Sequence, residues 1–151
     1  MTTTVRVLAG CVALIGIFAG RPAFAQLEIG TWVRKTPSQP EMTLIIEACC
    51  NGGRRLTYRF MIGKTAGSMT LETKLDGTDT PVLVEGKPSG ETMAIKREDD
   101  HHASTVIKMN GTVFATSKAT LSPDGKTLTA VTQNNGAPGP QGESTEVYVK
   151  Q

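Results

Sequence analysis

Two adjacent thiols, Cys49 and Cys50, are the strongest candidates for redox or metal chemistry in this 151-residue chain. Neighbouring Cα atoms lie about 3.8 Å apart across a trans peptide, below the usual disulfide range of about 4.4–6.8 Å. Because side chains alternate along an extended strand, one cysteine is expected to point inward and the other outward. We expect reduced or mixed-state thiols, with an intermolecular bridge, a strained vicinal disulfide and a metal site as the alternatives.

The densest polar run is Arg97-Glu98-Asp99-Asp100-His101-His102. Imidazoles beside carboxylates are suitable ligands for zinc or copper. On an extended chain His101 and His102 point to opposite faces, so they converge on one ion only in a turn. We therefore predict a solvated hairpin tip and no metal, with His101 and His102 as secondary candidates. A metal or redox site using Cys49, Cys50, His101 and His102 is an alternative function.

Other motifs of catalysis are absent from the sequence. It contains no Gly-x-Ser-x-Gly elbow, no glycine-rich phosphate loop and no His-Glu-x-x-His. We predict that the protein is not an enzyme and that it uses no cofactor.

The elements that must position these residues are short strands. Apolar residues recur at every second position in segments separated by Gly, Pro, Asp and Asn, which is typical of half-buried strands. The expected turns include Asn51-Gly52-Gly53, Leu75-Asp76-Gly77, Asn110-Gly111 and Ser122-Pro123-Asp124-Gly125. Nine or ten strands without a helix must close into a barrel or fold into a sandwich. Even spacing and short turns favour an all-β, single antiparallel up-and-down barrel of 8–10 strands, with a β-sandwich as the alternative.

A barrel of this size holds one small ligand inside when its interior is not filled by side chains. The alternation predicts inward-facing residues, which are the candidate ligand contacts: Leu44, Ile46, Tyr58, Phe60, Met69, Leu71, Met93, Ile95, Ile107 and Met109. The same residues could instead fill a solid core. The one local basic cluster is Arg54, Arg55 and Arg59. Arg55, Thr57 and Arg59 share a face opposite Leu56 and Tyr58, so a solvated outer face is expected, and capture of an anionic group or an acidic partner near the barrel mouth is the alternative.

The stretch Ile29-Gly30-Thr31-Trp32 carries a Gly-x-Trp on the first expected strand. With the domain length, the succession of strands, the segment 121–129 and the closing segment 146–150, it resembles the small secreted lipocalin-like domains of bacteria, within the calycin group. The resemblance covers nearly all of residues 27–151. It implies a closed barrel with Gly30 and Trp32 in structural roles near the closed end. Lipocalins pair this tryptophan with an arginine from a late strand, whereas here the last arginine is Arg97 and only lysines follow.

The first 25 residues have the parts of a secretory signal peptide: Arg6, an apolar stretch over residues 7–20, and small residues at Ala23 and Ala25. We expect cleavage between Ala25 and Gln26 and an exported protein, periplasmic or extracellular, with one domain over residues 26–151. A lipobox-like Leu8-Ala9-Gly10-Cys11 is the competing interpretation. The apolar stretch is too short to span a membrane.

Loss of the leader removes Arg6 and Arg21, and leaves 14 basic residues against 14 acidic ones. The mature chain therefore lacks the basic footprint of a nucleic-acid-binding protein. We predict an exported barrel that binds a small hydrophobic ligand. A protein-interaction or inhibitor module using loops 97–102 and 134–142 is the alternative. The pattern does not indicate an oligomeric state.

Overall fold

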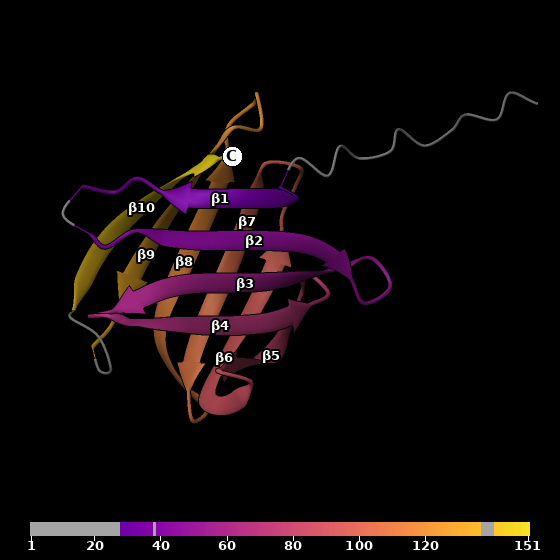
Figure 1. The fold of residues 1–151 in the computed structure, drawn as a ribbon. Coiled ribbons are helices and arrows are strands. Elements are labelled where there is room, and N and C mark those ends of the chain that lie inside the picture. Colours follow the sequence, from indigo (N-terminus) through magenta and orange to yellow (C-terminus); the bar gives the residue numbers. More distant parts are fainter. Residues whose placement is uncertain (1–27, 38, 137–140) are drawn as a thin grey trace, which may run out of the picture.

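Ten antiparallel strands form a closed barrel in a computed structural model that describes residues 28–37, 39–136 and 141–151. Each strand pairs with the next along the chain, and β10 pairs with β1 to close the ring (Figure 1). The strands are β1 (Gly30–Arg34), β2 (Met42–Cys49), β3 (Gly53–Ile62), β4 (Thr65–Thr73), β5 (Asp76–Val84), β6 (Lys87–Arg97), β7 (His102–Met109), β8 (Thr112–Leu121), β9 (Thr127–Asn134) and β10 (Gly142–Lys150).

The predicted all-β, up-and-down barrel is confirmed, and the sandwich alternative is wrong. No helix occurs among the described residues. These residues therefore include no helix that could cross a membrane. The predicted leader, residues 1–25, lies outside the described residues. So do residues 137–140 of the predicted loop 134–142.

Tight turns join the strands where the sequence supplies residues that accept a positive φ. Asn110 and Gly111 take φ values of 49° and 83° between β7 and β8, as a two-residue hairpin requires. The predicted turn after β2 is displaced by one residue, because Gly53 already pairs with Cys49 as part of β3. A Cβ at Gly53 would lie 2.4 Å from the Thr73 carbonyl oxygen, so this close approach of two backbones requires glycine.

The sequence of β5, Asp76–Val84, has no clean alternation of apolar and polar residues. Its pairing with β6 contains two register shifts, one of them between Pro81 and Leu83. Proline cannot donate a ladder hydrogen bond. Only Met69 and Thr70 of β4 pair in register with β5.

The turn expected over residues 75–77 is correct only in part, because Asp76 already belongs to β5.

Trp32 of β1 is fully buried beside the pairing of β1 with β10 that closes the barrel. Its indole nitrogen donates a hydrogen bond to the Glu28 carbonyl oxygen at 2.9 Å. The Lys150 ammonium of β10 lies 5.3 Å from the centroid of the ring, which is a cation–π distance. A lysine of the last strand thus lies over the ring of the buried tryptophan.

Candidate ligand cavity inside the barrel

The barrel interior contains a cavity of about 300 Å³. Most of the side chains around it are apolar, and they come from strands on all sides of the barrel. Larger residues on β2–β4 face smaller ones on β7–β9, including Thr105, Ser117, Ala119, Ala130 and Thr132. The interior is therefore not a solid core, because the small residues do not fill the space across from the large ones.

Seven of the ten predicted contact residues line this cavity: Leu44, Ile46, Tyr58, Met69, Met93, Ile95 and Ile107. The structure does not place the other three there. Leu71 is 1% exposed and packs in the core. Phe60 lies against Gly67, where a Cβ would meet its ring at 2.7 Å. Met109 is the last residue of β7.

Three small side chains of β8 and β9, Ala119, Ala130 and Thr132, line the cavity beyond the predicted contacts. Ala119 and Ala130 are register partners on these neighbouring strands. Thr132 donates a hydrogen bond from its hydroxyl to the Ser117 hydroxyl at 3.0 Å. The period-two alternation places these residues on the inward face, but small or polar side chains do not stand out in the sequence as contacts of an apolar ligand.

Two tyrosines and a carboxylate supply polar groups at the cavity wall. The Tyr148 hydroxyl donates to Glu146 at 3.1 Å, and Arg34 pairs with the same carboxylate. Burial raises the pKa of Tyr148, and the Glu146 charge adds to this effect. Burial also raises the pKa of Tyr58, with smaller contributions from Glu146 and Glu91. Burial therefore favours the neutral hydroxyl in both tyrosines, and the Tyr148 hydroxyl already donates its hydrogen to Glu146.

A charged cluster borders the cavity where β3 begins and β6 ends. One carboxylate oxygen of Glu28 accepts hydrogen bonds from Arg54 at 2.9 and 2.7 Å and a further bond from Arg97. Burial raises the pKa of Glu28, but hydrogen bonds from its own backbone and from Arg54, together with the charges of Arg97 and Arg54, lower it overall. Glu28 therefore holds two arginines of separate strands at one end of the cavity.

The basic cluster Arg54, Arg55 and Arg59 is divided between two faces of β3. Arg54 is 4% exposed and lines the cavity with Leu56 and Tyr58, two and four residues further along β3. Arg55 and Arg59 are exposed. The outer face predicted for Arg55 and Arg59 is confirmed, and the same period of two places Arg54 on the inward side.

The two histidines have separate partners at the tip between β6 and β7. Asp99 accepts hydrogen bonds from the backbone nitrogens of His101 and His102 at 2.7 and 2.8 Å. His102 Nδ1 lies 2.8 Å from the same carboxylate, whereas His101 Nδ1 lies 3.1 Å from the Leu121 carbonyl oxygen. The backbone bonds and the His102 side chain lower the pKa of Asp99. The carboxylate thus orders the turn.

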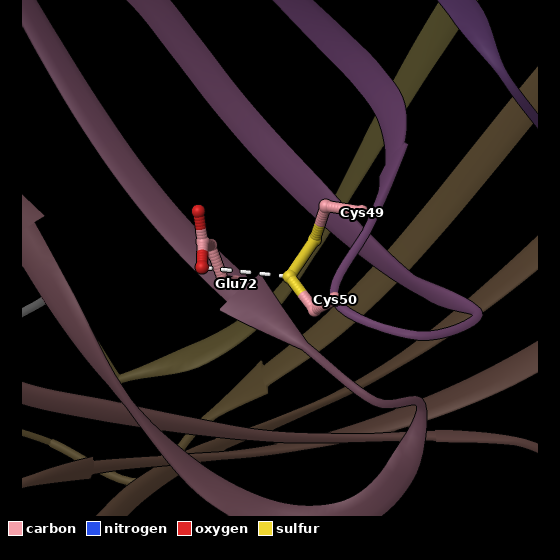
Figure 2. A group of neighbouring side chains, drawn as sticks. All are labelled: Cys49, Cys50 and Glu72. Carbon is pink, nitrogen blue, oxygen red and sulfur yellow. Dashed lines mark hydrogen bonds between the residues drawn. A yellow bond between two sulfur atoms is a disulfide. The ribbon is translucent and has the colours of Figure 1, made fainter.

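Cys49 and Cys50 form a vicinal disulfide (Figure 2). Reduced thiols were the main expectation, so that prediction is wrong for this structure, and the disulfide alternative is the one observed. The argument from alternating faces fails because Cys50 leaves the strand with a φ of 53°. In the described residues the group with metal-ligand spacing is Cys49, Cys50 and Glu72, and it includes neither histidine.

No protein-family model matches this chain, and no curated protein matches it significantly. The closed antiparallel barrel is compatible with a lipocalin-like domain. The resemblance therefore rests on the fold and on the Gly30-Thr31-Trp32 start.

Proposed function

We propose that this protein binds a small, largely apolar molecule inside its barrel. The observation that carries the proposal is the interior cavity of about 300 Å³ with its mainly apolar lining. Ligand pockets typically have volumes of about 300–1,000 Å³ and combine apolar walls with a few polar groups. Transfer of an apolar molecule from water into such a space is favourable because it removes apolar surface from water.

The polar groups around the cavity favour the same class of ligand. Among the described residues, every buried side-chain nitrogen and oxygen has a hydrogen-bond partner. Several polar groups at the cavity are already paired within the protein, so they need no polar partner from a ligand. The Tyr148 hydroxyl already donates to Glu146, and Ser117 already accepts from Thr132. An apolar body with few polar atoms suits this lining best.

Binding would take place outside the cytoplasm under this proposal, because residues 1–25 have the pattern of a secretory leader. Mass spectrometry of protein from its own host tests this part, with Gln26 as the expected first residue. An intact N-terminus beginning at Met1 would contradict export by cleavage.

Native mass spectrometry of the protein purified from its own host tests the binding proposal. We expect a population whose added mass disappears after extraction with organic solvent, and recovery of a small apolar compound in the extract. Protein that carries no compound, and that also fails to bind the neutral dye N-phenyl-1-naphthylamine, would contradict the proposal.

A further inference from the structure

Cys49, Cys50 and Glu72 form a compact cluster at the surface, where β2 turns into β3 and β4 ends. Their sulfur and carboxylate ligand atoms all lie within 4.8 Å of one another. We propose that reduction of the disulfide converts this cluster into a binding site for a thiophilic divalent cation such as Zn²⁺. The disulfide is the closed state of the site, because its sulfurs have no thiolate charge to offer a metal.

Glu72 is oriented toward the disulfide by a neighbouring arginine. Its Oε1 accepts hydrogen bonds from Arg55 Nε at 2.9 Å and Nη2 at 2.6 Å. Its Oε2 lies 3.4 Å from Cys50 Sγ. A dashed line marks this contact in Figure 2. A disulfide sulfur carries no hydrogen, so this contact is not a hydrogen bond in the oxidised protein. Glu72 Oε2 therefore lies beside the sulfurs and is available to bind a metal.

The turn brings both sulfurs to the same side of the chain. Cys50 and Asn51 each have a φ of 53°, so the chain leaves the extended conformation directly after Cys49. Consecutive side chains no longer alternate between faces at this point, and the two sulfurs meet. Cys50 and Glu72 are exposed and Cys49 is half-buried, so a reductant and then a cation reach the cluster from solvent.

Reduction needs a thiol as co-reactant. A thiolate attacks Cys50 Sγ, the sulfur–sulfur bond breaks, and Cys49 leaves as a thiolate that takes up a proton. A second thiol attacks the mixed disulfide, which releases the Cys50 thiol and forms the disulfide of the reductant. Two electrons pass from the two small thiols to the protein. Exposure favours attack at Cys50, because Cys49 is half-buried.

The reduced cluster has the ligand chemistry of a zinc site. Thiolates prefer soft and borderline metals, and Zn²⁺ combines Cys sulfur with carboxylate oxygen in tetrahedral coordination. Zn–S bonds of about 2.3 Å place two tetrahedral sulfurs about 3.8 Å apart, a separation that the opened pair must reach. Cys49, Cys50 and Glu72 supply three ligands and water supplies the fourth. Binding releases the two thiol protons, so affinity rises with pH.

Zinc titration of the full chain tests the proposal. Protein reduced with excess dithiothreitol and desalted without oxygen is titrated with Zn²⁺ against a chromophoric chelator, beside oxidised protein. We expect one Zn²⁺ per reduced chain and none per oxidised chain. Cd²⁺ replaces Zn²⁺ in a second titration, in which a sulfur-to-metal charge-transfer band reports thiolate ligation directly.

Matched variants separate this site from other ligands. The C49S/C50S double variant retains Cys11 and is expected to bind no zinc. Glu72→Gln is expected to weaken zinc binding by at least about tenfold. Glu47 is the exposed register partner of Arg55 on β2, so Glu47→Gln is the matched control and is expected to bind zinc as the parent does. The H101Q/H102Q variant is also expected to bind zinc as the parent does.

Two results would overturn the proposal. One is reduced parent protein that binds no more zinc than C49S/C50S. The other is equal affinity of the Glu72→Gln and Glu47→Gln variants, which would remove the carboxylate from the site even if C49S/C50S failed to fold.

Discussion

The two opposite sides of the barrel differ in the size of their inward side chains. In a closed ring of ten strands each strand faces the one five places away, so β3 lies across from β8. The inward residues of β3 include Leu56 and Tyr58, whereas those of β8 include Ser117 and Ala119. We call β2–β4 the large wall and β7–β9 the small wall. Short side chains on the small wall leave space that longer ones would fill.

The largest expected effect comes from truncation of the large wall. Leu71 is 1% exposed within the core, and Leu71→Ala is expected to lower the free energy of unfolding by about 2–5 kcal/mol. Thr105→Ala on the small wall is expected to cost less than about 1 kcal/mol, because an atom beside an empty space loses few contacts. Urea unfolding measures both variants. Equal losses would show that the two walls are packed alike.

A variant of Glu28 tests whether its ion pairs with Arg54 and Arg97 stabilise the end of the barrel at which β3 begins. Arg54 of β3 is buried, and Glu28→Gln is expected to cost about 2 kcal/mol at pH 7, since hydrogen bonds between charged groups are lost. The folded-state pKa of Glu28 is below its ordinary value of 4.5. Its contribution is therefore complete above pH 4.5 and is lost as the pH falls through the lowered pKa.

Urea unfolding of the parent and the Glu28→Gln variant at several pH values measures this contribution. The difference between them is expected to shrink below pH 4.5. A difference that stays constant down to pH 3 would show that the Glu28 charge does not stabilise the fold.

The smallest expected effect concerns β1 and β10, where the two walls meet. Lys150→Met keeps the aliphatic stem beside Trp32 and removes the cation, so we expect a loss of about 0.5–1 kcal/mol. Lys150→Arg is expected to retain the stability of the parent. Thermal unfolding measures the series. A Lys150→Met variant as stable as the parent would show that the cation does not help to hold Trp32.

The sequence predicts the barrel well because each strand needs only a period of two and each tight turn needs a residue that accepts a positive φ. Asn110-Gly111 meets that need and forms the predicted turn. The alternation fails at β5, where Pro81 lies beside a register shift. It also misplaces Cys50, because a single positive φ reverses the side on which a side chain lies.

The cavity was harder to predict than the strands. A period of two identifies the inward face, but the empty space depends on which residues oppose one another across the ring. Ala119 and Ala130 are adjacent on neighbouring strands, yet they are 11 positions apart in the sequence. Glu28 likewise joins Arg54 and Arg97, a contact that depends on barrel closure and leaves no linear motif.

A cavity-filling pair of variants tests the central claim most directly. Ala119 lines the cavity, whereas its neighbour Thr120 is exposed. Titration with N-phenyl-1-naphthylamine compares Ala119→Phe with Thr120→Phe, and circular dichroism checks that both variants fold. We expect Ala119→Phe to lose dye binding by at least about tenfold, equivalent to 1.4 kcal/mol or more, and Thr120→Phe to bind as the parent does. Equal dye binding by both variants would contradict a ligand site inside the barrel.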